Sequence, residues 1–249
     1  MPTEKRTRKR EGRMARQQAM EEARRRHARR RRFFTLILPA AIALLALAFF
    51  TSRGEDEGDE TDVATSEGCP AAGGESTRTT AFATAPPNCI DPEKTYTAEV
   101  ATTKGTFTIT LDPERAPQTV NSFVFLARHR FYEGVLFHRI IPGFVVQGGD
   151  PQGTGSGGPG YEFADELPEA GEYKIGSVAM ANSGPDTNGS QFFVITGDQG
   201  VQLPPSYSLF GQVTEGMDVV QALEAVGTPG AGTPTEEVKI EEVTIHEAE

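Results

Sequence analysis

The stretch "FHRIIPGFVVQGGD", residues 137–150, joins two strand-like apolar runs through Pro-Gly and contains a single arginine, Arg139. A polar side chain in an apolar run is costly unless it is paired. The stretch holds no serine, cysteine or lysine that could act as a nucleophile beside this arginine. It therefore predicts a chemistry that uses a fixed cation and an apolar pocket, with no covalent step.

The segments around this stretch predict a mainly β fold with two helices. Residues 96–111 alternate as strands do around Lys104-Gly105, a hairpin signature. Apolar residues recur with helical periodicity in residues 116–130 and 216–226. Further strand-like runs lie at residues 134–141, 143–149, 173–181, 191–196, 207–213 and 236–247. Many strands with two separated helices predict a closed antiparallel barrel with helical plugs.

Three segments of this region resemble the signature segments of cyclophilins, the peptidyl-prolyl cis-trans isomerases. They are "FYEGVLFHRIIPGFVVQGGDPQGTG" at 131–155, "MANSGPDTNGSQFFVIT" at 180–196 and "SLFGQV" at 208–213. They occur in the order and spacing of that family. The resemblance implies a closed eight-stranded antiparallel barrel capped by two α-helices, with the site on its outer face. It also implies an isomerase that needs no cofactor, metal or covalent intermediate.

The resemblance gives Arg139 a physical role. An X–Pro amide is held planar by resonance, with a rotation barrier of about 18–20 kcal/mol. Rotation localises the lone pair on the proline nitrogen, so a donor aimed at that atom is most useful in the twisted transition state. A permanently charged, forked guanidinium suits this task. Arg139, Gln147, which would hold the guanidinium, and Phe144, which would line the pocket, are the residues expected to carry catalysis.

The same resemblance assigns a set of residues to substrate binding. Ala181 and Asn182 would bind the substrate backbone, and Gln191 would border a neighbouring pocket. The residues expected to bind substrate are Val145, Gly153, Thr154, Ala181, Asn182, Gln191, Phe193, Gln202, Leu203 and Tyr207. Periodicity alone favours a different reading, in which Phe144 and Phe193 belong to an ordinary barrel core.

Three of these positions depart from the best-known eukaryotic cyclophilins. Val145 stands where methionine is usual, Gln202 where tryptophan is usual and Tyr207 where histidine is usual. None of them is the catalytic cation, so isomerase activity is expected to survive. That tryptophan supplies a contact to cyclosporin, so weak cyclosporin binding is expected here.

A second function remains open, a non-catalytic binding module or chaperone that holds Pro-containing segments in the same groove. Such a module needs chiefly the apolar floor. The presence of both Arg139 and Gln147 therefore favours the enzyme, whose substrates would be Pro-containing polypeptides.

Residues 33–50 contain no charge and, as a helix, would be about 27 Å long, close to the roughly 30 Å of a bilayer core. Arginines precede this segment and acidic residues follow it, so the N-terminus is expected in the cytoplasm and the rest outside it. A cleaved signal peptide is the alternative, with Ala46-Leu47-Ala48 as a small-residue cleavage site. The long basic region favours an uncleaved single-pass anchor, and the layout resembles the membrane-anchored bacterial cyclophilins.

Residues 1–32 form a basic tail on an acidic protein. They carry 14 Lys/Arg and 4 Glu, a net of +10, while the rest carries 10 and 31, a net of −21, which together give −11. The tail has no aromatic residue for base stacking, so nucleic acid is not the expected partner. The expected partner of this basic tail is anionic membrane lipid.

Residues 51–91 are rich in small and polar residues and predict an extracytoplasmic, partly disordered linker before a catalytic domain at 92–249. The chain's two cysteines, Cys69 and Cys89, both lie in this linker. A disulfide between them is expected in an exported segment, with free thiols or pairing to other chains as alternatives.

Neither a metal nor a nucleotide site is predicted. The sequence has no CxxC, and its four histidines are scattered singly. "GTGSGG" at 153–158 matches a dinucleotide-binding pattern but leads into Pro159-Gly160 instead of a helix.

Overall fold

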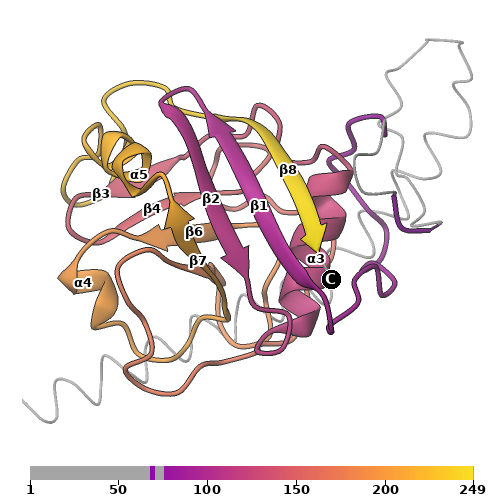
Figure 1. The fold of residues 1–249 in the computed structure, drawn as a ribbon. Coiled ribbons are helices and arrows are strands. Elements are labelled where there is room, and N and C mark those ends of the chain that lie inside the picture. Colours follow the sequence, from indigo (N-terminus) through magenta and orange to yellow (C-terminus); the bar gives the residue numbers. More distant parts are fainter. Residues whose placement is uncertain (1–67, 71–75, 249) are drawn as a thin grey trace, which may run out of the picture. The chain divides into compact units, whose positions relative to one another are not determined.

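The computed structural model describes residues 68–70 and 76–248 of the chain, and their fold is built on one sheet (Figure 1). The predicted basic tail at 1–32 and membrane helix at 33–50 lie outside these residues. Within the described ranges, none of the helices combines the length and the hydropathy that crossing a bilayer requires.

Eight antiparallel strands form this sheet in the order β3-β4-β6-β5-β7-β2-β1-β8. The hairpin expected around Lys104-Gly105 is confirmed, because β1 and β2 pair from Thr102 with Gly105 to Tyr96 with Leu111. The strands are β1 (Thr95–Thr102), β2 (Gly105–Leu111), β3 (Arg139–Ile141), β4 (Val145–Gly148), β5 (Ser177–Met180), β6 (Phe192–Ile195), β7 (Leu209–Glu215) and β8 (Ile240–Ala248).

The expected closure of the barrel is wrong, because the sheet is a curled half-barrel with β3 and β8 at its two edges. β3 has 3 residues and β8 has 9, so β3 is too short to continue the ladder along β8. The segments next to these strands meet only locally. Leu136 and Lys239 form an isolated bridge, and Phe137 N donates to Val238 O at 3.0 Å.

The two predicted helices are confirmed as α3 (Pro117–Arg128) and α5 (Met217–Glu224). Pro117 begins α3, where its missing N–H costs no hydrogen bond. The next two N–H groups donate to the carboxylate of Glu166, at 3.0 Å from Gln118 and 2.9 Å from Thr119. A further helix, α4 (Asp198–Val201), has 4 residues and was not predicted, because one turn is too short to show periodicity.

Alternation along the central strands sends side chains to two separate apolar clusters. Val146 on β4 and Phe192 on β6 lie in the main core, whereas Val145 and Phe193, their neighbours in sequence, lie in a second cluster. We call the second one the outer cluster. It consists of the buried residues Val145, Tyr173, Ala179, Phe193, Ile195 and Leu209, with Phe144, Ala181, Val201, Leu203 and Tyr207 packed against them.

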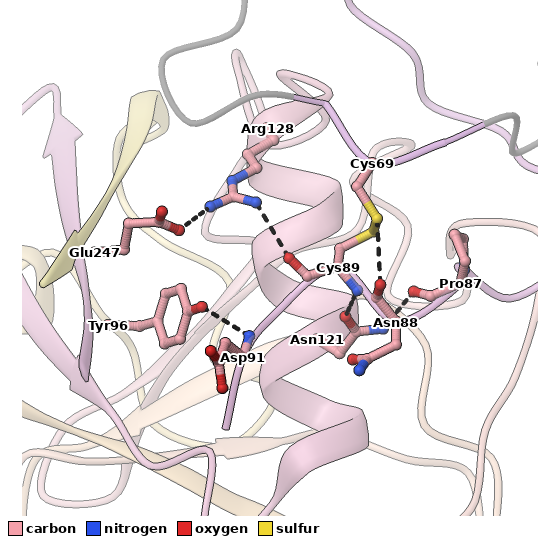
Figure 2. Close-up of a disulfide and its surroundings, with 9 residues drawn as sticks. All are labelled: Cys69, Pro87, Asn88, Cys89, Asp91, Tyr96, Asn121, Arg128 and Glu247. Carbon is pink, nitrogen blue, oxygen red and sulfur yellow. Dashed lines mark hydrogen bonds and ion pairs between the residues drawn. A yellow bond between two sulfur atoms is a disulfide. The ribbon is translucent and has the colours of Figure 1, made fainter. Parts of the chain in front are cut away.

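Residues 76–91, which the sequence assigns to the linker, pack against the domain, and we call them the strap. Phe82 and Ile90 of the strap are buried in the main core, with 2% and 7% of their surface exposed. A disulfide joins Cys69 to Cys89 at a Cα–Cα distance of 5.3 Å (Figure 2). Next to it, Cys89 N donates to Asn121 Oδ1 of α3 at 2.6 Å. The folded unit therefore includes the strap.

Candidate active site

The pairing of two short strands places the predicted cation beside its predicted partner. β3 and β4 are antiparallel, with Arg139 opposite Gln147 in the register. Arg139 Nη1 donates to Gln147 Oε1 at 3.0 Å. Gln147 Nε2 donates to Gln191 Oε1 at 3.1 Å, and Gln191 Nε2 donates to Gly157 O at 3.0 Å. The guanidinium is thus the first member of a polar chain that ends on the backbone of a loop.

Within the part of the chain that the structure describes, Arg139 has a neutral hydrogen-bond partner and no carboxylate partner. Among the ion pairs of the residues that the structure describes, none includes Arg139, and its side chain is only half-buried. Its partner is a neutral amide, which orients the guanidinium without neutralising it. A cation in this state retains its electrostatic attraction for an electron-rich atom of a ligand.

A Pro-Gly turn brings Phe144 next to this cation. Gly143 adopts a φ of +73°, which favours glycine, and Phe144 N donates to Ile141 O at 3.1 Å to close the turn. The guanidinium carbon of Arg139 lies 5.5 Å from the centroid of the Phe144 ring. This cation–π contact joins the charged part of the site to the outer cluster.

The outer cluster contains most of the side chains that were expected to form the proline pocket. Phe144, Val145 and Phe193 belong to it. For Phe144 and Phe193, periodicity alone had suggested the main core instead. Phe193 and Tyr207 pack edge to face with their ring centroids 5.3 Å apart. The remaining expected members of this cluster are Ala181 and Leu203.

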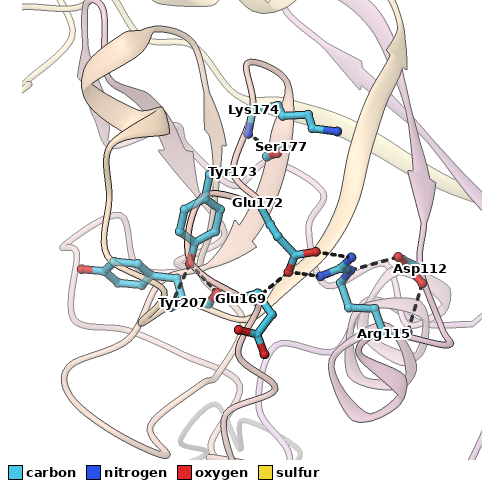
Figure 3. A network of polar contacts seen from close by, with 8 residues as sticks. All are labelled: Asp112, Arg115, Glu169, Glu172, Tyr173, Lys174, Ser177 and Tyr207. Carbon is cyan, nitrogen blue, oxygen red and sulfur yellow. Dashed lines mark hydrogen bonds and ion pairs between the residues drawn. The ribbon is translucent and has the colours of Figure 1, made fainter.

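Tyr173 fixes the position of Tyr207 and was missed by the sequence reasoning. Its hydroxyl donates to Tyr207 O at 2.7 Å and accepts from Tyr207 N at 3.1 Å (Figure 3). Burial raises the pKa of Tyr173 to about 12, so this hydroxyl keeps its proton at neutral pH. A tyrosine in an alternating segment looks like any strand residue, and nothing in the sequence marks its partner.

A polar cavity of about 620 Å³ adjoins the outer cluster. Four of the expected site residues line it, namely Gln147, Ala181, Asn182 and Gln191. Its opposite wall is the loop of residues 155–162. Asn182 is tied to the neighbouring loop, because its Nδ2 donates to Ser206 O at 2.9 Å.

Asp150 organises the loop on this side of the cavity and was also missed. It has no exposed surface, and its carboxylate accepts hydrogen bonds from Gln152 N, Thr154 N and Oγ1, Gly155 N and Gly157 N at 2.6–3.1 Å. Burial acts to raise the pKa of Asp150, but these hydrogen bonds outweigh it, and the pKa lies below its ordinary value. The "GGD" sequence was the available signal.

Three expected substrate-binding residues are placed less directly at the site. Thr154 directs its hydroxyl to Asp150 at 3.1 Å, so it serves the loop. A Cβ added to Gly153 would lie 3.2 Å from Leu136 Cδ1, which shows how closely that turn packs. Gln202 is exposed at the C-cap of α4.

The fold is that of a cyclophilin. The family model "Cyclophilin type peptidyl-prolyl cis-trans isomerase/CLD" matches residues 97–245, and the chain belongs to this family. The sequence-based prediction of the family and of the enzyme class is therefore confirmed.

Individual relatives agree with this assignment. The chain is 44% identical over 172 residues to peptidyl-prolyl cis-trans isomerase A of Mycobacterium tuberculosis, covering 62% of this chain and 94% of the relative. It is 44% identical over 167 residues to peptidyl-prolyl cis-trans isomerase B of Streptomyces anulatus, covering 59% and 95%.

Solved structures give the same result. A cyclophilin type peptidyl-prolyl cis-trans isomerase of Cryptosporidium parvum has a TM-score of 0.58 and 33% identity, covering 62% of this chain and 99% of that one. A second structure of that protein, obtained in the presence of the dipeptide Ala-Pro, has a TM-score of 0.56, with 60% and 98% covered.

Proposed function

We propose that the face around Arg139 is the active site and that it accelerates rotation about X–Pro bonds without a covalent intermediate. The observation that carries this proposal is the juxtaposition of an uncompensated cation with the outer cluster. Arg139 is held at 3.0 Å by Gln147 and lies 5.5 Å from the Phe144 ring. Arg139 and the outer cluster together supply a fixed positive charge beside an apolar surface.

The chemistry follows from the electronic change during rotation. The planar amide delocalises the nitrogen lone pair, and the twisted amide does not, so a hydrogen bond from Arg139 to the proline nitrogen is stronger in the transition state. Each 1.36 kcal/mol gained this way gives about a tenfold acceleration. A guanidinium remains charged over the whole physiological pH range, so the step needs no proton transfer.

The outer cluster is the proposed seat of the proline ring. Phe193 and Tyr207 meet edge to face, and Phe144 lies on the side nearest the cation. The C. parvum relative crystallised in the presence of Ala-Pro supports a Pro-containing ligand for this face. Apolar surroundings also exclude water that would stabilise the planar amide.

The test is isomerisation of a short X–Pro peptide by the purified full chain, followed by two-dimensional exchange NMR without any coupled protease. We expect cis-trans exchange to become faster in proportion to enzyme concentration. Saturable binding of the peptide without faster exchange would favour the binding module instead and would contradict this proposal.

We further propose that the protein is a single-pass membrane protein whose catalytic domain lies outside the cytoplasm and assists the folding of exported proteins. The support is the change from a basic tail at 1–32 to an acidic segment after residues 33–50. The disulfide between Cys69 and Cys89 adds to it, because such bonds persist mainly in oxidising compartments.

Protease added to intact spheroplasts tests this topology. We expect the catalytic domain to be released or digested while a short N-terminal fragment is protected. A protected catalytic domain would contradict the proposal, as would a mature chain that begins after residue 48.

A further inference from the structure

The strap is joined to the end of α3 through the helix's last carbonyl groups, which have no partner within the helix. Ser76 Oγ donates to Arg128 O at 2.6 Å, and Thr79 N donates to His129 O at 3.1 Å. The far end of the strap is held by the disulfide at Cys89 (Figure 2). The strap therefore has fixed attachments on both sides of Phe82.

Phe82 anchors the middle of the strap in an aromatic group. Its ring centroid lies 5.0 Å from that of Phe125, 5.1 Å from that of His129 and 6.4 Å from that of Tyr161. All three contacts are edge-on, a favoured geometry for aromatic pairs. Tyr161 belongs to the loop that forms one wall of the polar cavity.

The backbone of Phe82 is in close contact with the same loop. Phe82 N donates to Pro159 O at 2.8 Å. Gly160, which follows Pro159, has a φ of +97°, and a Cβ built on it would lie 2.4 Å from Phe82 O. The two backbones approach so closely that only glycine fits between them.

The other side of this loop holds the polar chain of the active site. Gly157 O accepts the hydrogen bond from Gln191 Nε2, and Gln191 in turn accepts one from Gln147, the partner of Arg139. The loop of residues 157–161 thus lies between the strap on one side and this chain on the other.

We propose that Phe82 is a positioning residue for the active site. By holding the 157–161 loop from behind, it fixes the carbonyl that orients Gln191, and through Gln147 it restrains the guanidinium of Arg139. The strap precedes residue 97, where the match to the family model begins. This role rests on the proposed function, because it acts through Arg139.

The test compares two strap variants in the full chain. Phe82→Ala removes the ring that packs against Tyr161 and leaves the backbone hydrogen bond to Pro159. We expect kcat/KM for an X–Pro peptide to fall about tenfold, mainly through kcat, as misplaced catalytic groups do. The matched control is Ile90→Ala, which removes another buried strap residue. Ile90 is buried in the same main core but is not part of the aromatic group around Phe82 and Tyr161. Its kcat/KM should stay within about twofold of wild type at a temperature where both variants are folded.

A spectroscopic readout separates positioning from general destabilisation. In Phe82→Ala the side-chain amide NMR signals of Gln147 and Gln191 should shift, and in Ile90→Ala they should not. Phe82→Leu keeps the apolar bulk and should recover part of the lost kcat; it also replaces Phe82→Ala if that variant does not fold. Equal effects of the Phe82 and Ile90 variants on kcat and on these signals would overturn the inference.

Arg139→Ala, measured in the same assay, separates failure of the proposed function from failure of the proposed role of Phe82. If Arg139→Ala keeps wild-type activity, the proposed function fails whatever the strap variants do. If Arg139→Ala is inactive while Phe82→Ala behaves as Ile90→Ala does, only the role of Phe82 fails.

Discussion

Arg115 and Arg139 show two different environments for a partly exposed guanidinium. Arg115 donates to both carboxylate oxygens of Glu172, at 2.6 and 3.0 Å, and to Asp112 at 3.2 Å (Figure 3). Arg139 donates to the amide oxygen of Gln147 at 3.0 Å and has no ion pair with any described residue.

The difference lies in the acceptor. Hydrogen bonds from Arg115 lower the pKa of Glu172, so that pair neutralises itself and contributes modestly to stability, as exposed ion pairs do. The amide of Gln147 orients Arg139 at no cost to its charge. The ion-paired Arg115 and the proposed catalytic Arg139 therefore differ in what accepts their hydrogen bonds.

Replacing Arg139 or Arg115 by alanine should give the largest difference in catalytic rate between two variants. Arg139→Ala should lower kcat/KM by about 10³-fold, the range seen when one preorganised transition-state donor is lost. Circular dichroism should show an unchanged fold, because the residue lies outside both apolar clusters. The exchange NMR assay on the full chain provides the rates.

The matched control is Arg115→Ala, the same substitution at the ion-paired site. We expect its rate to equal that of wild type, with only a small loss of stability, because exposed ion pairs contribute little. Comparable rate losses in the two variants would show that the acceptor does not distinguish these arginines.

Giving Arg139 a carboxylate partner should make its environment resemble that of the ion-paired Arg115. Gln147→Glu keeps the shape of the side chain but neutralises the guanidinium, and we expect kcat/KM to fall about 30-fold because transition-state attraction weakens. Gln212→Glu on β7, whose amide bonds to Ile175 O, is the control and should leave the rate unchanged. A fully active Gln147→Glu variant would show that free charge on Arg139 is not needed.

The expected substrate-binding residue Gln202 allows a smaller test through cyclosporin. Gln202 is exposed at the end of α4 and lacks the flat apolar area that contributes roughly 25 cal/mol per Å² on burial. We expect Gln202→Trp to tighten inhibition by at least about tenfold. Tyr207 already supplies one ring beside the outer cluster, which limits the gain.

Gln199→Trp places the same side chain at another exposed position of α4 and should leave inhibition as in wild type. Turnover of a short X–Pro peptide should change little in either variant. Inhibition of the wild-type protein at low nanomolar drug would contradict the expectation for Gln202.

Much of the site was predictable because it is encoded in contiguous segments. Arg139 and Gln147 lie 8 residues apart on either side of a Pro-Gly turn, so a hairpin must bring them together. Phe193 could be assigned to the pocket only through the family resemblance. Alternation places it on one face of β6 but does not say which face is the core.

The parts that were not predicted depend on long-range convergence. Asp150 acts through backbone N–H groups of the following turn, which no side-chain pattern reveals. Phe82 is a single aromatic in a segment with the composition of a linker, and its partners lie 43 to 79 residues away, at Phe125 and Tyr161. The prediction of a closed barrel was wrong because apolar alternation indicates which residues form strands but not which strands pair with each other.

His129 offers the last and smallest test, because it shows what happens to a cationic group that can give up its charge. It packs against Phe82 and Phe125, and its Nε2 is buried without a partner among the described residues. Burial lowers the pKa of His129 below its ordinary value of 6.5. The unfolded chain therefore binds more protons just below pH 6.5, and the free energy of unfolding should fall as the pH drops through that value toward the folded pKa.

Urea unfolding of the full chain at pH 7.5 and pH 5.5 measures this loss. His129→Gln should make the two free energies of unfolding more nearly equal, whereas the exposed His246→Gln should leave their difference as in wild type. Some pH dependence should remain in His129→Gln, because burial also lowers the pKa of His138. If His129→Gln and wild type lost the same stability between the two pH values, His129 would not be held neutral beneath Phe82. Arg139 is a cationic group that keeps its charge without a carboxylate partner, and His129 is one that is expected to lose its proton. That result would remove the second half of this comparison.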